Sequence, residues 1–354
     1  MPNLKKLLRP HLSNLKPYSS ARDEYTGKAK VFLDANENAL GSVTKRNLSR
    51  YPDPYQTEVK EKLSDIIGVP TPNIFLGNGS DEPIDLLFRA FCEPASEDHV
   101  ILCPPTYGMY QVCADINNVK VKEVSLTTEY QLDVKSIKTA IDQNTKLIFI
   151  CSPNNPTGNN IKEADILQVI QHAGDALVIV DEAYIDFSSS PSFVAQLNTY
   201  DNLLVLQTFS KSWGMAAARL GMAYAHRDII AVLNQIKYPY NLSQQTQDLA
   251  IEGLKNHVSK NTMVSEILRN KTTLRDSLER LELVVHIYPS DANFFLVKVL
   301  DATAVYNYLL EKSTIVRDRS KVSLCENCLR ITVGTQEENK TLLEGLKSFR
   351  LEEE

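Results

Sequence analysis

The chain has 354 residues, of which 43% are hydrophobic and 23% are charged, and its formal net charge is −6. This length exceeds what one hydrophobic core usually organises, so two domains are expected. The net negative charge does not attract nucleic acid, so no nucleic-acid partner is expected. No apolar run approaches the roughly 20 residues that span a bilayer, so no membrane partner is expected either.

The N-terminal region is predicted to be an arm rather than a domain. Residues 1–45 contain Pro10, Pro17 and many polar side chains, and their one apolar run, 30–33, is predicted to be a short strand. The first ten residues carry basic side chains but lack the apolar core of a secretory signal. A cytoplasmic location is therefore expected.

A helix and a strand are predicted next. Apolar residues recur at helical spacing over 57–67, and Gly68 follows where a C-terminal cap belongs. A short apolar strand at 74–76 leads to Ser80, which is expected to be the N-cap of the following helix.

Apolar strands then alternate with helical segments. Fully apolar strands separated by helices indicate a mostly parallel sheet covered by helices on both faces, so the fold class is α/β. The strands are predicted at 100–102, 147–150, 177–180 and 203–206, with a helix at 166–173.

Distinctive polar residues follow the ends of these strands. Ligands of an open α/β sheet bind at the carboxyl ends of its strands, so these side chains should converge although they are far apart in the sequence. They are Ser80, Tyr107, Asn155, Asp181, Tyr184 and Lys211.

The character of the sequence changes after residue 240. A long charged helix at 259–281 is followed by a mixture of strands and helices, which indicates a smaller α+β domain. The predicted division is an N-terminal arm at 1–45, a large α/β domain at 46–240 and a small domain at 241–354. Within the small domain, strands are expected at 283–286, 293–299 and 329–333, and helices at 302–311 and 337–349.

Lys211 lies at the end of a buried strand, where its ammonium group is costly unless it is solvated, paired or used in chemistry. A neutral lysine amine could form an imine with an aldehyde cofactor. Arg219, eight residues later, could hold a phosphate with two hydrogen bonds. The alternative is a surface lysine and arginine beside a loop, and these two residues alone do not decide between the readings.

The converging residues together favour pyridoxal phosphate. A pyridine ring accepts electrons when its nitrogen is protonated, which a buried carboxylate such as Asp181 enforces, although an aspartate here could also cap a turn. Asn155 and Tyr184 could donate to the ring oxygen, and Tyr107 could stack on the ring or simply be a core aromatic. A phosphate would fit the helix N-terminus, hydroxyl and cation supplied by Gly79, Ser80, Asp81, Ser210 and Arg219.

These motifs give the chain a family resemblance. Residues 152–158, 181–184 and 208–212, with Arg219, resemble the fold-type-I pyridoxal-phosphate aminotransferases. More narrowly, the chain is similar from end to end to the histidinol-phosphate aminotransferase family, and the residues that carry this similarity are 17–22, 33–38, 50–54, 90–94, 316–318 and 328–334. It departs from the family pattern at Ala217 and Ala39, where glycine and proline are often found, and both departures concern loop conformation.

The resemblance implies a role for each site residue. Lys211 would bind the cofactor and move the proton, Asp181 would pair with the ring nitrogen, and Tyr107 would stack on the ring. Tyr51 would reach the phosphate of the partner subunit's cofactor, so a homodimer is implied. The implied substrate contacts are Tyr18, Asn36, Arg317 and Arg330.

The two substrate arginines carry the choice of substrate. Arg330, joined by Arg317, is implied to accept either the carboxylate of glutamate or the phosphate of histidinol phosphate. The alternative for Arg317 is an exposed ion pair with Asp318, and Arg319 is expected to be an ordinary surface residue.

The resulting expectation is a transaminase that interconverts histidinol phosphate and 2-oxoglutarate with imidazole-acetol phosphate and glutamate, in histidine biosynthesis. The alternatives are a broad aromatic aminotransferase, a threonine-phosphate decarboxylase of similar fold, and a non-enzymatic binding module. Cys325 and Cys328 form a CxxC pattern, but no second pair or histidine pair accompanies them, so two reduced thiols are expected and no metal.

Overall fold

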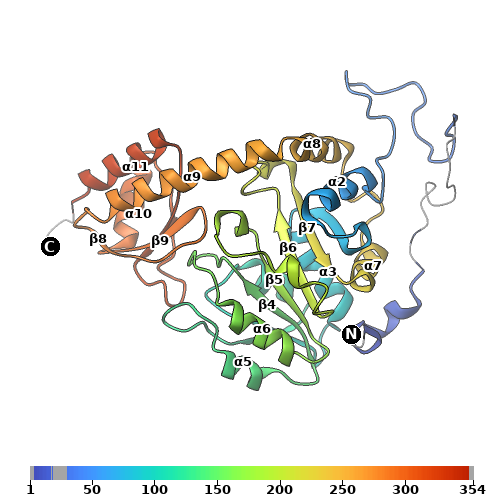
Figure 1. Cartoon of the computed structure of the whole chain (residues 1–354), viewed down its shortest axis with the longest axis horizontal. Helices are drawn as coiled ribbons and strands as arrows, with labels where there is room; N and C mark the ends of the chain where they lie inside the picture. The colour runs from blue at the N-terminus through green and yellow to red at the C-terminus, as the bar shows by residue number, and fades with distance from the viewer. Residues whose placement is uncertain (1–3, 17, 19–29, 351–354) are drawn as a thin grey trace.

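The computed structural model describes residues 4–16, 18 and 30–350. A large α/β body and a smaller sheet-and-helix body lie side by side, joined by the long helix α9 (His257–Leu278) (Figure 1). Within the described residues, no helix is both long and apolar enough to cross a membrane.

The large body is built on a seven-stranded sheet in the order β1-β7-β6-β5-β4-β2-β3. Strands β2 to β6 run parallel to one another, whereas β7 runs antiparallel to both of its neighbours. The strands are β1 (Ile74–Asn78), β2 (His99–Leu102), β3 (Lys120–Glu123), β4 (Thr145–Cys151), β5 (Leu177–Asp181), β6 (Leu203–Thr208) and β7 (Leu220–Ala225).

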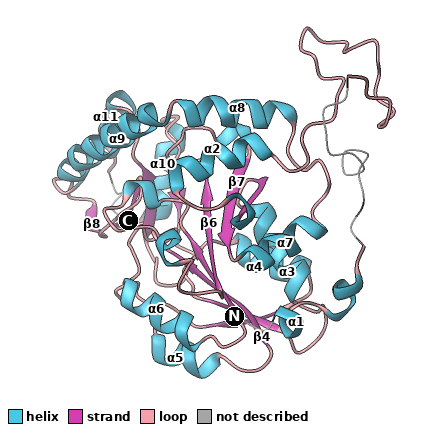
Figure 2. Cartoon of the chain, turned by 45° about the vertical axis from the view of Figure 1, so that its right-hand side comes forward, coloured by secondary structure: helices cyan, strands magenta, loops and turns pink. Residues whose placement is uncertain are grey.

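Helices cover both faces of this sheet (Figure 2). Along β4, Ile148 and Ile150 enter one core while Leu147 and Phe149 enter the other, as the alternation of side chains in a strand requires. The first face packs against α2 (Thr57–Ile67), α5 (Val134–Ala140), α6 (Glu163–His172) and α8 (Gln244–Lys255). The second packs against α1 (Leu4–Leu7), α3 (Asp81–Phe91), α4 (Met109–Ile116) and α7 (Arg227–Ile236).

The smaller body has its own antiparallel sheet, in the order β10-β11-β9-β8, and its own core. The strands are β8 (Val284–Ile287), β9 (Phe294–Val299), β10 (Arg317–Asp318) and β11 (Cys328–Thr332), and the helices α9, α10 (Ala302–Glu311) and α11 (Gln336–Ser348) pack with them. The boundary proposed at residue 240 stays a prediction, and α8, which follows that residue, packs on the core of the large body.

The predicted α/β class is confirmed, and so are the strands and helices predicted after residue 56, to within a few residues. The short strand predicted at 30–33 is wrong. No strand forms there, and Val31 and Leu33 are 71% and 85% exposed. An apolar run becomes a strand only where a neighbour offers backbone hydrogen bonds, and this segment projects from the body before α2 (Figure 1).

Glycines at positions 77, 79 and 221 let the turn after β1 lie directly against β7. Gly77 pairs with Gly221 across the β1–β7 ladder, and the Gly79 N–H group donates to the Arg219 carbonyl at 2.9 Å. A Cβ atom on Gly221 would lie 2.2 Å from Gly79 C and from Ser80 N. The obstructing atoms are backbone, so no change of rotamer would relieve the clash.

We therefore predict that Gly221→Ala lowers the free energy of unfolding by about 2 kcal/mol or more, because the β1 turn must move away from β7. Chemical denaturation at matched protein concentration measures this. Gly108→Ala is the matched control, since a Cβ there meets nothing within 4 Å. Equal stability of the two variants would contradict the close packing described.

Candidate active site

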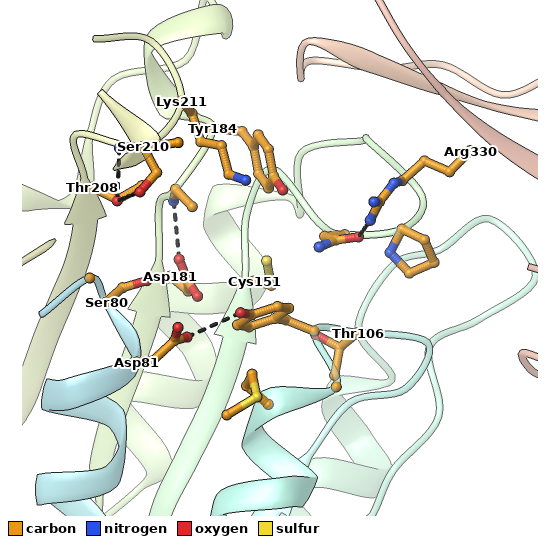
Figure 3. A pocket seen from close by; sticks show the side chains of 18 of the residues that line it. Ser80, Asp81, Thr106, Cys151, Asp181, Tyr184, Thr208, Ser210, Lys211 and Arg330 are labelled. Atoms are coloured by element: carbon orange, nitrogen blue, oxygen red, sulfur yellow. Dashed lines mark hydrogen bonds between the residues drawn. The ribbon is translucent and has the colours of Figure 1, made fainter. Parts of the chain in front are cut away.

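A cavity of about 560 Å³ opens at the carboxyl ends of the parallel strands and extends to the small body (Figure 3). All but three of the site residues predicted from the sequence line it. They are Gly79, Ser80, Asp81, Tyr107, Asn155, Asp181, Tyr184, Ser210, Lys211, Arg219, Arg317 and Arg330.

Lys211 follows β6 and is directed into the cavity toward Tyr184, with its Nζ atom 5.5 Å from the centre of that ring (Figure 3). Burial lowers the pKa of the Lys211 ammonium group, and the nearby Arg330 guanidinium lowers it further. Both effects favour the neutral amine, which is the nucleophilic form of lysine.

Asp181 ends β5 at the floor of the cavity and is only 2% exposed. Its carboxylate accepts a hydrogen bond from the Tyr110 hydroxyl at 2.6 Å and from the Ala183 N–H group at 3.1 Å. Burial raises the pKa of the Asp181 carboxyl, while these two donors oppose the rise. Tyr110 was not predicted, because a tyrosine among apolar residues of a helix has the sequence pattern of a core aromatic.

The N-terminus of α3, where β1 leads into this helix, lies at the cavity and suits an anion. The first N–H groups of α3 have no acceptor within the helix and carry the positive end of its dipole. Ser80 occupies the predicted N-cap position, but its side chain makes no capping hydrogen bond. The predicted N-cap position is therefore confirmed, but the hydroxyl does not cap the helix, since Ser80 has helical backbone angles (φ −70°, ψ −12°) instead of the extended ones that aim a capping oxygen at the helix.

Cationic and hydroxyl groups face the same site from the turn after β6. The Arg219 guanidinium is half-exposed and lies 3.7 Å from the Asp81 carboxylate. The Thr208 hydroxyl donates to Ser210 Oγ at 3.0 Å, and Thr208 Oγ1 accepts from the Ser210 N–H group at 3.1 Å. Thr208 also lines the cavity, and its role as a support for Ser210 was not predicted.

The aromatic residues of the cavity have defined neighbours. The Tyr107 hydroxyl donates to Asp81 at 3.1 Å, and its ring meets Tyr110 edge-on at 5.5 Å. Tyr184 is nearly buried and meets Phe294 of the small body edge-on at 5.1 Å between ring centres.

Arg330 of β11 enters the cavity from the small body (Figure 3). Its Nη1 atom donates to Asn155 Oδ1 at 2.5 Å, and its guanidinium carbon lies 5.4 Å from the Phe294 ring centre. This hydrogen bond ties the small body to the loop after β4.

Arg319 also lines the cavity, so its prediction as an ordinary surface residue is wrong. Arg317 and Arg319 are two positions apart on an extended segment, and side chains at that spacing lie on the same face.

Three predicted residues do not line the cavity. Tyr18 is 74% exposed, Asn36 lies in the segment before α2 with φ 54°, and Tyr51 is 51% exposed. The Tyr51 ring stacks on Tyr240, 4.5 Å between centres. Elsewhere, Cys325 and Cys328 are buried free thiols, and the described residues contain no group of three His, Cys, Asp or Glu side chains that could hold a metal.

The residues of the cavity fit pyridoxal phosphate. An amine of lowered pKa and a buried carboxylate line the same cavity, together with a helix N-terminus and an arginine. These are the groups that an aldehyde, a pyridine nitrogen and a phosphate require.

Comparisons with known proteins agree with this geometry. The profile of the family "Aminotransferase class I and II" matches residues 22–346. A protein of Cytophaga hutchinsonii named histidinol-phosphate aminotransferase is 52% identical over 98% of this chain and 99% of its own length.

Solved structures share the fold. The histidinol-phosphate aminotransferase of Clostridium acetobutylicum superposes with a TM-score of 0.78 at 23% identity, covering 85% of this chain and 90% of that one. The enzyme of the same name from Sinorhizobium meliloti, solved in complex with pyridoxal 5'-phosphate, has a TM-score of 0.76 at 19% identity, covering 85% and 82%. The chain belongs to the class I and II aminotransferases.

Proposed function

We propose that this protein is a pyridoxal-phosphate-dependent transaminase that interconverts histidinol phosphate and 2-oxoglutarate with imidazole-acetol phosphate and glutamate, a step of histidine biosynthesis. The full-length similarity to proteins named histidinol-phosphate aminotransferase supports the reaction. The single structural observation that supports it is one cavity lined by Lys211 and Asp181 together with Arg317, Arg319 and Arg330.

Several residues would hold the cofactor. Asp181 would pair with the pyridine nitrogen, and its raised pKa makes it a stronger base toward that proton. Asn155 and Tyr184 would donate to the ring oxygen, and Tyr107 would stack on the ring. The phosphate would be held by Gly79, Ser80, Asp81, Ser210 and Arg219.

When bound, pyridoxal phosphate supplies an electron sink for negative charge on the carbon that bears the amino group. Lys211 would form the covalent attachment and then act as the base, since desolvation lowers the pKa of its ammonium group and so favours the neutral amine. Nζ would move the proton from that carbon of the amino donor to the aldehyde carbon of the cofactor, and with the amino acceptor it would move a proton in the opposite direction.

The substrate would be oriented by its anionic end. Arg330 and Arg317 are directly opposite each other in the β10–β11 pair, so their side chains start from neighbouring positions on the same face of the sheet. A carboxylate or a phosphate ester could therefore contact both. Tyr18 and Asn36 are proposed to contact the substrate as well.

A homodimer is proposed to complete the site, with Tyr51 reaching the phosphate of the partner subunit's cofactor. Tyr51 is half-exposed outside its own cavity, and large apolar side chains around it are exposed, which is typical of an interaction surface. Exposed large apolar side chains of the chain include Val31, Leu33, Leu40, Val43 and Tyr55 in the segment before α2, and Tyr238, which is two residues from the stacking partner Tyr240. A cytoplasmic location is also proposed, in line with buried cysteines that are all unbridged.

We predict that Lys211→Ala abolishes transamination while the protein stays folded, because the change removes a nucleophile and leaves the hydrophobic core intact. Steady-state assays with histidinol phosphate and 2-oxoglutarate measure the loss, and circular dichroism checks the fold. Normal turnover by the variant would refute the central role of Lys211. Faster turnover of phenylalanine than histidinol phosphate, or release of CO₂ from threonine phosphate, would instead favour the alternative activities.

The two substrate arginines should differ in effect. Arg330→Ala should weaken glutamate and histidinol phosphate alike, by roughly tenfold or more each, because a charge-assisted hydrogen bond is lost in both cases. Arg317→Ala should weaken the phosphate ester more than glutamate. Single-turnover titrations with each donor measure this, and equal losses for both donors in Arg317→Ala would count against the division.

Mixed dimers test the role of Tyr51. Tyr51→Phe should weaken cofactor binding by roughly tenfold through loss of a hydrogen bond to phosphate. A dimer of one Tyr51→Phe subunit and one Lys211→Ala subunit has one intact site only if Tyr51 serves the partner. Recovery of wild-type cofactor affinity in half of the sites is therefore expected. If Tyr51 serves its own subunit, the mixed dimer will contain no intact site.

A further inference from the structure

Arg319 has a fixed backbone position beside the two substrate arginines. Its N–H group donates to the Cys328 carbonyl at 2.8 Å, which extends the β10–β11 pairing by one residue beyond Asp318. Arg317 and Arg319 therefore share a face, and Arg317 lies directly opposite Arg330. All three arginines line the same cavity.

The acidic residue between them does not neutralise this cluster. The Asp318 carboxylate accepts hydrogen bonds from the Ser320 N–H and hydroxyl groups and from Thr303. Within the described part of the chain, no carboxylate lies within 4.0 Å of the guanidinium nitrogens of Arg317, Arg319 or Arg330. Among the described residues, the three guanidinium groups therefore have no ion-pair partner, although the Asp318 carboxylate opposes the lowering of the pKa of Arg319.

Of the three arginines, Arg319 is the one with a buried hydrogen-bond donor that lacks an acceptor among the described residues. Its Nε atom is buried and has no hydrogen-bond partner, and its side chain makes no hydrogen bond with the described residues. Burial lowers the pKa of the Arg319 guanidinium, and Arg330 and Arg317 lower it further. A desolvated cation beside two like charges is costly unless a ligand supplies the missing anion.

The turn that follows Arg319 is held by the large body. The Val322 N–H group donates to the Arg319 carbonyl at 2.8 Å, and the Tyr130 hydroxyl donates to the Leu324 carbonyl at 2.6 Å. Cys325 and Cys328 are fully buried and close the turn through their backbone groups. The CxxC segment therefore positions Arg319, which gives both cysteines a packing role.

We propose that Arg319 is a specificity-determining residue that supplies a third guanidinium to the phosphate ester of the substrate and contributes little to binding glutamate. The proposal rests on the proposed function. A phosphate monoester carries a charge of about −1.5 to −2 on three oxygens, whereas a carboxylate carries one charge on two. Arg330 and Arg317 can satisfy two oxygens with forked hydrogen bonds, so only the phosphate leaves an oxygen for a third guanidinium.

The test compares the two half-reactions of the holoenzyme, each followed separately by the cofactor's absorbance. Arg319→Gln should raise the dissociation constant for histidinol phosphate by about ten- to a hundredfold and that for glutamate by less than about threefold. Arg319→Lys keeps the charge but loses the fork and should recover part of the affinity. Arg280→Gln, at an exposed position outside the cavity, is the control for the same loss of net charge.

Inorganic phosphate provides a second readout that does not depend on the identity of the natural substrate. It should inhibit the glutamate half-reaction of the wild type competitively, and Arg319→Gln should weaken this inhibition at least fivefold. Equal losses in both half-reactions, or unchanged binding of both histidinol phosphate and inorganic phosphate, would overturn the proposal. A wild-type enzyme that does not convert histidinol phosphate would refute the proposed function, while the phosphate readout would still test Arg319.

Discussion

The burial of the Asp181 carboxylate is the constraint on which the site depends. A carboxylate at the end of an apolar strand loses its hydration, and the fold must return donors or cations to it. Burial raises the pKa of the carboxyl, and the two donors, the Tyr110 hydroxyl from α4 and the N–H group of Ala183, oppose this rise together with Lys211 across the cavity. The positions of β5, β6 and α4 are thus linked through the Asp181 carboxylate. The same carboxylate could accept a hydrogen bond from a protonated ring nitrogen.

Much of the fold could be predicted because its central strands are buried on both faces. Such strands are continuous apolar runs, which are easy to recognise in the sequence. Among the helices, α10 was predicted at 302–311, which are the bounds observed. β7 escaped prediction because Leu220–Ala225 contains glycine and alanine, and its burial comes from pairing with β1 and β6. The run at 30–33 failed for the opposite reason, since apolar composition alone does not supply a hydrogen-bonding neighbour.

The positions of the site residues were predictable to the extent that they follow strands. Lys211, Asp181 and Asn155 stand out because polar side chains interrupt apolar runs at one edge of the sheet. Tyr110 does not, since its contact with Asp181 joins residues 71 positions apart, and nothing in its helix distinguishes a hydroxyl with a partner from one without. The place of Arg319 beside Arg317 could have been predicted from the alternation of side chains along a strand. Only the structure shows that its Nε atom is buried and has no hydrogen-bond partner among the described residues.

The hydrogen bond between Arg330 and Asn155 makes the two ends of the cavity thermodynamically dependent on each other. An anion that takes over the Arg330 guanidinium competes with the Asn155 amide oxygen, so the loop after β4 gains or loses a partner as that end fills. Coupling of this kind is reciprocal: a ligand that reorients Asn155 changes the affinity of the arginines for anions by the same factor. This hydrogen bond between the two bodies therefore allows a ligand at one end of the cavity to change the affinity at the other end without any large movement of the backbone.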